Sequence, residues 1–219
     1  MKTKKIARLQ VITQDLPGSS HAHQAELACQ GGARWIQFRM KTADGDKEQL
    51  ALETLAVCRK YGAQLIINDD AVLASKIAAD GVHLGKTDLP VDAARQILGP
   101  DAIIGATANS WTDIQQILLT SADYIGLGPF RFTETKENLS PVLGIEGYRF
   151  IFEKTGAGII PVIAIGGILP ADIESILQTG VQGIAVSAAI SRAQNPVAAT
   201  EEFIRHILKS SNLFYTPAP

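Results

Sequence analysis

The stretch Gln64-Leu65-Ile66-Ile67-Asn68-Asp69-Asp70 is a short apolar run that ends in polar and acidic residues. A second run of the same form, Gly81-Val82-His83-Leu84-Gly85, leads to Asp88. Both runs predict buried parallel strands. Because α/β folds bind ligands at the carboxyl ends of their strands, we expect Asp69 and Asp88 to face one site from neighbouring strands. Two carboxylates beside Asn68 suit Mg²⁺ held together with a diphosphate.

Strand-like and helix-like segments alternate along the whole chain with short connections. The eight predicted strands cover residues 8–13, 34–39, 64–68, 81–84, 102–106, 124–126, 160–165 and 183–187. A helical period follows each strand, over about residues 21–30, 47–61, 71–79, 91–98, 111–120, 144–154, 170–178 and 196–209. This order predicts an α/β fold, a single-domain (β/α)8 TIM barrel over residues 1–219 with a flexible tail at 211–219. A doubly wound open sheet is the alternative.

The composition is that of a chain with a large apolar core. Hydrophobic residues make up 46% of the 219 residues, and the formal net charge is −2. This charge gives no reason to expect binding to nucleic acid or to a membrane surface. Cys29 and Cys58 have no metal-ligand spacing, which predicts two reduced core thiols. Because neither a signal-peptide run nor a membrane-length apolar segment is found, we expect a cytoplasmic location.

The segment Gln37-Phe38-Arg39-Met40-Lys41 ends the second predicted strand and alternates polar and apolar residues. Such alternation places the three polar side chains on one face of a strand. Two cations and an amide near the two aspartates predict a clamp for a diphosphate. A charged strand end with solvated head groups is the alternative.

A long polar loop follows the sixth predicted strand and begins with Gly126-Leu127-Gly128-Pro129. Glycines let a backbone approach a ligand closely. Further along the loop, Thr133, Thr135 and Lys136 offer hydroxyl and cationic donors to a phosphate. Long βα loops of this kind often cover active sites, although an ordinary surface loop is the alternative. Glu134 either lines the site or faces water.

The ends of the seventh and eighth predicted strands also favour phosphate binding. Ile165-Gly166-Gly167-Ile168 and Ser187-Ala188 lie there. In this fold, the corresponding loops bind phosphate through backbone N–H groups and a helix N-terminus. A glycine pair that only eases a tight turn is the alternative. Thr107, at the end of the fifth strand, is a further hydroxyl donor, whereas we expect a structural hydrogen bond from His83.

Together these motifs resemble one known family. They are Gln37-x-Arg39-x-Lys41, Ile67-Asn68-Asp69, residues 80–85 with Asp88, Gly128-Pro129 with Thr133-x-Thr135-Lys136, and Ile165-Gly166-Gly167-Ile168. The same motifs occur in the same order in thiamine phosphate synthases, and the resemblance runs from about residue 8 to residue 199. It implies a (β/α)8 barrel and a Mg²⁺-dependent transferase. That enzyme joins 4-amino-2-methyl-5-(diphosphooxymethyl)pyrimidine to a thiazole phosphate, giving thiamine phosphate and diphosphate.

The resemblance also implies a role for each matching residue. Asp69 and Asp88 are expected to bind Mg²⁺, and the expected catalytic residues are Arg39, Lys41, Thr107 and Lys136. The expected substrate-binding residues are Gln37, Phe38, Arg39, Met40, Lys41, Asn68, Thr107, Thr133, Glu134, Thr135, Lys136, Gly167, Ser187 and Ala188. Three positions depart from the family pattern. Thr107 stands where serine is usual, Phe132 replaces a usual proline, and the serine at Ser187 comes one place early.

Three other functions are alternatives to this one. A related thiazole tautomerase would keep the phosphate loops but would not need the diphosphate clamp. A non-catalytic thiamine-phosphate sensor would be expected to carry a regulatory domain, and a sugar-phosphate isomerase would not need the paired aspartates. The expected partners are small-molecule substrates, and the sequence allows a homo-oligomer without indicating one.

Overall fold

Eight parallel strands close into a barrel in which each strand pairs with the next and β1 pairs with β8. The computed structural model describes residues 4, 6–42, 45–132, 141–155 and 159–212. The strands are β1 (Leu9–Ile12), β2 (Trp35–Phe38), β3 (Gln64–Asn68), β4 (Gly81–Leu84), β5 (Ile103–Ala108), β6 (Tyr124–Leu127), β7 (Val162–Ile165) and β8 (Gly183–Val186). The closed order confirms the predicted barrel and excludes the open sheet.

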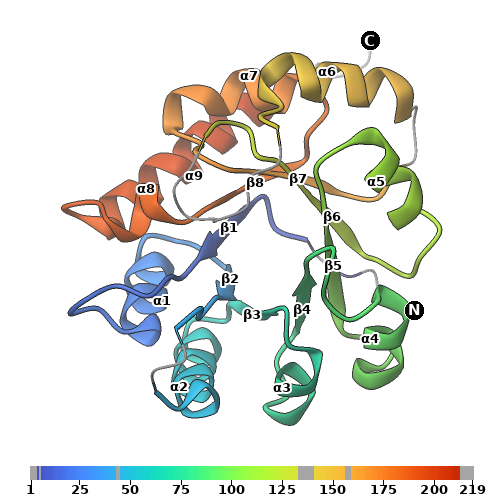
Figure 1. Cartoon of the computed structure of the whole chain (residues 1–219). Coiled ribbons are helices and arrows are strands. Elements are labelled where there is room, and N and C mark those ends of the chain that lie inside the picture. The colour runs from blue at the N-terminus through green and yellow to red at the C-terminus, as the bar shows by residue number, and fades with distance from the viewer. Residues whose placement is uncertain (1–3, 5, 43–44, 133–140, 156–158, 213–219) are drawn as a thin grey trace.

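Helices surround the strands as an outer ring (Figure 1). They are α1 (His21–Gln30), α2 (Lys47–Lys60), α3 (Ala71–Lys76), α4 (Val91–Leu98), α5 (Trp111–Ile117), α6 (Gly144–Thr155), the 3₁₀ helix η1 (Pro170–Asp172), α7 (Ile173–Gln178), α8 (Ala188–Ser191) and α9 (Pro196–Asn212). Asp70 and Ser110 begin α3 and α5 by accepting hydrogen bonds from Leu73 N and Asp113 N. Among the described residues, no helix has the length and apolar character needed to cross a membrane.

Two apolar clusters hold the barrel together. The larger one lies between the strands and the helices and includes both cysteines, which are buried and free. The smaller one fills the barrel interior with Ile12, Trp35, Ile66, Ile103, Tyr124, Ile163 and Ala185. In that interior, the rings of Trp35 and Tyr124 meet edge to face at 4.9 Å. The barrel is therefore packed below the rim, and a ligand has room only at its ends.

The predicted boundaries differ from the observed ones mainly at strand ends. β2 ends at Phe38, so Arg39 lies beyond the strand rather than in it. The predicted helix at residues 170–178 is divided into η1 and α7. The helix α8 was not predicted, because four residues are too few to show a helical period. Helix α9 continues to Asn212, so the first two residues of the predicted tail are helical.

Candidate active site

Asp69 and Asp88 lie together at the carboxyl ends of β3 and β4. The backbone N–H of Asp69 donates to His83 O at 2.8 Å, and Gly85 N donates to Asp88 Oδ2 at 2.6 Å. Asp69 has a φ of 66°, a left-handed conformation that aspartate tolerates better than most residues. Partial burial of its carboxyl, then a hydrogen bond to Asp88 and repulsion by it, raise the pKa of Asp69 to about 6. The negative charge of this pair is therefore not fully neutralised by its neighbours.

Arg39 and Lys47 supply the positive charge nearest to this pair. Arg39 is half-buried, and burial lowers its pKa while the carboxylates of Asp69 and Asp15 oppose that effect. Lys47, the first residue of α2, forms an ion pair with Asp70 at 3.0 Å and helps to lower the pKa of Asp69. The site thus brings carboxylates and cations together, a combination that suits a metal ion bound with a polyanion.

Asp15 holds the segment that carries Arg39 and Lys41. Its Oδ2 accepts the backbone N–H groups of Lys41 at 2.8 Å and Thr42 at 3.0 Å. Its Oδ1 lies 3.1 Å from Nε2 of the buried His21. These contacts lower the pKa of Asp15 against the opposing effect of burial. The loop after β1 therefore positions the cationic segment after β2.

A threonine and a histidine belong to the same hydrogen-bond network as Asp15. His21 Nδ1 lies 2.7 Å from Thr13 Oγ1, which also accepts the backbone N–H of Arg39 at 3.3 Å. The His21 ring packs against Phe38 with the ring centroids 4.6 Å apart. Phe38 is fully buried on the helix side of the barrel and Met40 packs against the same cluster. Any contact of Phe38 with a substrate is therefore left to its backbone.

Gln37 and Thr107 face the barrel interior from opposite sides. Gln37 is 2% exposed and donates to Gln10 Oε1 at 3.2 Å. Thr107 is half-buried, and its Oγ1 lies 3.0 Å from His83 Nε2. The structural hydrogen bonds expected for His83 are present. Gln37 thus points inward, while Arg39 and Lys41 lie on the segment beyond the strand end, so the three polar residues do not form one continuous strand face.

The loops after β6 and β7 support one another through their backbones. Phe130 N donates to Ile165 O at 2.8 Å, and Arg131 N donates to Gly166 O at 3.0 Å. Arg131 also reaches Gly167 O at 2.7 Å and pairs with both carboxylate oxygens of Asp172. Gly167 has a φ of 63°, which favours glycine at this turn. The loop after β7, which is the predicted phosphate loop, is therefore held in place by the loop after β6.

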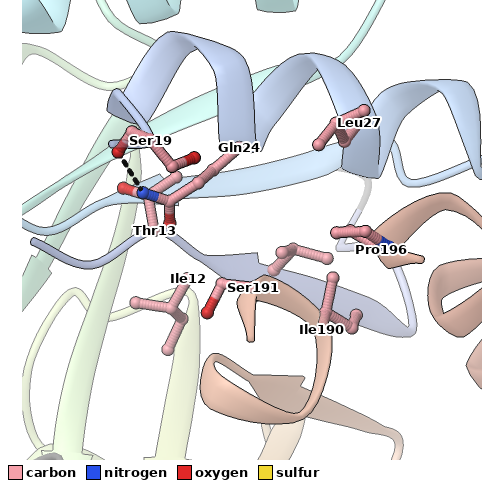
Figure 2. Close-up of a pocket in the computed structure, with 9 residues that line it drawn as sticks. Ile12, Thr13, Ser19, Gln24, Leu27, Ile190, Ser191 and Pro196 are labelled. Carbon is pink, nitrogen blue, oxygen red and sulfur yellow. Dashed lines mark hydrogen bonds between the residues drawn. The ribbon is translucent and has the colours of Figure 1, made fainter. Parts of the chain in front are cut away.

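Ser187 lies at the end of β8 and immediately before α8. Its Oγ is buried and has no hydrogen-bond partner among the described residues. A nearby cavity, shown in Figure 2, lies between β1, α1, the end of α8 and the start of α9, and its volume is about 40 Å³. Because one water occupies about 30 Å³ in the liquid, this cavity is too small for either expected substrate.

The residues present fit a Mg²⁺ ion that is shared with a ligand. Among the described residues, no group of three or more histidine, cysteine or acidic side chains gathers as a metal cage. Mg²⁺, however, is commonly held by one or two carboxylates, with waters and phosphate oxygens completing its octahedron. Asp69 and Asp88 would provide the two carboxylates, and the repulsion between them is the structural sign that a cation is suited to this place.

Some predicted residues lie outside the described part of the chain, and some contributors were not predicted. Thr133, Glu134, Thr135 and Lys136 all fall in the undescribed segment 133–140. Gln10, Asp15, Tyr124 and Lys47 were not foreseen as part of the site. A glutamine inside the apolar run Leu9–Ile12 is one signal that could have revealed Gln10. Nothing in the local pattern marks Lys47.

The chain is similar to known proteins of one family. The family description "thiamine monophosphate synthase" matches residues 9–190. A thiamine-phosphate synthase from Phocaeicola vulgatus is 50% identical over 203 residues, covering 91% of this chain and 98% of that protein. One from Flavobacterium psychrophilum is 45% identical over 192 residues, covering 86% and 93%.

Solved structures agree as well. The structure of a thiamine phosphate pyrophosphorylase from Pyrococcus furiosus matches with a TM-score of 0.81 and 34% identity, covering 93% of this chain and 96% of that one. A structure described as native KDPGal has a TM-score of 0.76 at 13% identity, which shows a shared fold alone. By sequence and by structure, this chain belongs to the thiamine monophosphate synthase family.

Proposed function

We propose that this chain is a thiamine-phosphate synthase, a transferase that joins an aminopyrimidine diphosphate to a thiazole phosphate and releases diphosphate. The observation that carries the proposal is the Asp69–Asp88 pair at the ends of β3 and β4, with Arg39 beside it. Two carboxylates next to a guanidinium suit a metal-bound diphosphate. The names of relatives up to 50% identical support the same reaction.

The residues of the rim have distinct roles in this reaction. Arg39 and Lys41 bind the diphosphate and stabilise the negative charge that grows on it as the carbon–oxygen bond breaks. Gln37 and Asn68 orient the pyrimidine diphosphate. Mg²⁺, when bound by Asp69 and Asp88, supplies further positive charge for the leaving group. The electrons of that bond leave with the diphosphate oxygen.

The thiazole phosphate is placed at the opposite side of the rim. Gly167 and the backbone of Ser187 and Ala188 receive its phosphate, and Thr133 and Thr135 contact the ring. The thiazole nitrogen uses its lone pair to form the new carbon–nitrogen bond at the exocyclic methylene. Because this nitrogen is already a nucleophile, the reaction needs no general base. A rim rich in cationic and metal-binding groups is consistent with that chemistry.

The direct test is an assay of thiamine phosphate formation with both substrates, in excess Mg²⁺ and after chelation. Product that forms only with both substrates and the metal supports the proposal. The absence of product under all conditions contradicts it. A cytoplasmic location and a homo-oligomer are separate predictions, which this assay does not test.

Lys136 separates the proposed reaction from the tautomerase alternative. We expect Lys136→Ala to lower kcat far more than it raises KM for either substrate, because the lysine opposes charge on the departing diphosphate. A thiazole tautomerase releases no diphosphate, so its reaction would be left nearly intact by this change. An effect confined to KM would contradict the leaving-group role.

A further inference from the structure

A continuous chain of hydrogen bonds crosses the barrel interior from β2 to β5. Gln37 Nε2 donates to Gln10 Oε1 at 3.2 Å, and Gln10 Nε2 donates to the Tyr124 hydroxyl at 3.3 Å. That hydroxyl lies 2.9 Å from His83 Nδ1, and His83 Nε2 lies 3.0 Å from Thr107 Oγ1. This hydrogen-bond chain thus joins Gln37 and Thr107, two residues that are expected to bind the pyrimidine diphosphate.

The barrel is shaped around the centre of this chain. Tyr124 is fully buried and His83 is 9% exposed. A Cβ atom at Gly105 would stand 2.1 Å from Cζ of Tyr124, and one at Gly126 would stand 2.8 Å from Cε1 of His83. Glycine at these two positions on β5 and β6 therefore makes room for the two rings. In such an interior, an unmade hydrogen bond is costly, so the chain has reason to stay complete.

Two directions of this hydrogen-bond chain are distinguished by where the protons lie. The Gln10 amide donates from its nitrogen to the Tyr124 hydroxyl. In the first direction, that hydroxyl gives its own single proton to His83 Nδ1, so that each buried donor is used. A neutral histidine that accepts at Nδ1 carries its proton on Nε2. His83 then donates to Thr107 Oγ1, and the proton of Thr107 is left for a ligand.

The reverse direction would have the opposite consequence. If His83 carried its proton on Nδ1, the hydroxyl of Thr107 would donate to His83 Nε2. Thr107 could then only accept a hydrogen bond from a ligand. Oxygens of a diphosphate are acceptors, so only the first direction is complementary to them.

We propose that Gln10, Tyr124 and His83 are positioning residues that orient the Thr107 hydroxyl as a hydrogen-bond donor to an anionic oxygen of the substrate. The inference rests on the proposed function, in which that oxygen belongs to the diphosphate. None of the three residues need touch the substrate, because their effect passes through Thr107.

The first test measures the tautomer of His83 in the free, wild-type protein by ¹⁵N–¹H correlation of the histidine rings. The signal of His83 is assigned by its contacts with the Tyr124 ring protons. We expect a neutral ring protonated on Nε2. A ring protonated on Nδ1 overturns the proposal. This result does not depend on activity. It therefore separates a wrong direction of the hydrogen-bond chain from a wrong proposed function.

The second test is a double-mutant cycle on kcat/KM for the pyrimidine diphosphate. We expect Tyr124→Phe to lower it about tenfold, the size of one weakened hydrogen bond to a charged acceptor. In a Thr107→Val background, the same change should cost almost nothing further, because Thr107 is the output of the chain. Losses that multiply in the double variant overturn the proposal, since they would show that Tyr124 acts independently of Thr107.

Two further variants control for a general loss of packing. Tyr148 is also fully buried, and its hydroxyl donates to Leu127 O at 2.8 Å, outside the chain. Tyr148→Phe should therefore lower thermal stability to a similar extent and leave kcat/KM unchanged. Thr107→Ser keeps the hydroxyl and should keep the sensitivity to Tyr124→Phe. An equal loss of kcat/KM in Tyr148→Phe and Tyr124→Phe would contradict the positioning role.

Discussion

At the scale of single residues, Asp69 combines two features that cost stability. Its φ of 66° lies in the left-handed region, and its carboxyl lies against that of Asp88. Strain and like-charge contacts of this kind gather at functional sites, where the surrounding structure maintains them. Asp69 is exposed at the barrel rim, so solvent weakens the repulsion without removing it. This local cost in stability is consistent with a cation-binding site at Asp69 and Asp88.

We expect Asp69→Asn and Asp88→Asn to remove most turnover, by about 3 kcal/mol of transition-state stabilisation each, because each takes away a metal ligand. Steady-state kinetics over a range of Mg²⁺ concentrations checks this. Without metal, both variants should unfold at the same temperature as wild type or slightly higher, because the repulsion is relieved. Near-normal turnover in both variants, unchanged by a chelator, would contradict the metal assignment.

At the scale of elements, loops and helix exits position the strands and the site. Asp80 and Asp123 each precede a strand, β4 and β6, in the repeated pattern of a helix exit followed by a buried run. Asp80 Oδ2 accepts Leu65 N, and Asp123 Oδ2 accepts Ile104 N, both at 2.8 Å. Each acid therefore satisfies an N–H of the preceding strand in the barrel. The repeat reflects a structural need at the base of the barrel rather than a binding site.

Asp123 should consequently matter more for stability than an exposed acid does. It also pairs with Lys4 at 2.9 Å and Arg95 at 2.7 Å, and its side chain is 19% exposed. We expect Asp123→Ala to lower the free energy of unfolding by about 2–3 kcal/mol, because it leaves a strand N–H without its acceptor and removes the carboxylate that pairs with two cations. Glu146 is the control. Its side chain is 82% exposed, and Glu146→Ala should cost less than about 1 kcal/mol. Urea unfolding of both variants makes the comparison.

The hydrogen bonds that Asp15 accepts from the segment after β2 should affect activity rather than overall stability. We expect Asp15→Ala to lower kcat/KM for the pyrimidine diphosphate about tenfold or more, because the segment with Arg39 and Lys41 loses its backbone acceptor. Asp46→Ala is a matched control nearby, since Asp46 caps α2 by accepting Gln49 N at 3.1 Å. That variant should lose about 1 kcal/mol of stability and keep its kinetics. Unchanged kinetics in Asp15→Ala would contradict the role of Asp15 in positioning that segment.

At the scale of the whole molecule, the carboxyl of Asp69 links stability to pH. Its folded pKa of about 6 is above its ordinary value of 3.8, so the folded protein binds the proton more tightly than the unfolded chain. The resulting penalty is absent below about pH 3.8 and complete above about pH 6. In metal-free protein, the stability of wild type relative to Asp69→Asn should therefore rise as pH falls from 7 to 4. Thermal unfolding of both proteins measures this difference, and a constant difference would contradict the raised pKa.

His21 has the opposite effect over a neighbouring range. Burial lowers its pKa below 6.5, with Asp15 opposing, so its contribution to stability is present above pH 6.5 and is lost as pH falls. The comparison with Asp69→Asn is needed because it cancels this contribution. The pH profile of wild type alone would mix the two.

The secondary-structure elements and the positions of the acidic pair follow from local sequence patterns. The 3.6-residue and strand-like patterns are local, so they predicted all eight strands and the helices longer than one turn. The proximity of Asp69 and Asp88 was predictable because each follows a strand, and the carboxyl ends of parallel strands lie on one face of the barrel. The exact ends of the strands and the four-residue helix α8 were not predictable, because no period can be established over so few residues.

The contacts between distant polar groups, in contrast, depend on how the barrel folds. Gln10 and Tyr124 are 114 residues apart, and Tyr124 and His83 are 41 apart, yet they share one chain of hydrogen bonds in the barrel. Asp15 acts on the backbone of Lys41, 26 residues away. No local pattern encodes these contacts, because they arise when closure of the barrel between β1 and β8 brings the inward-facing side chains of all strands into one small interior.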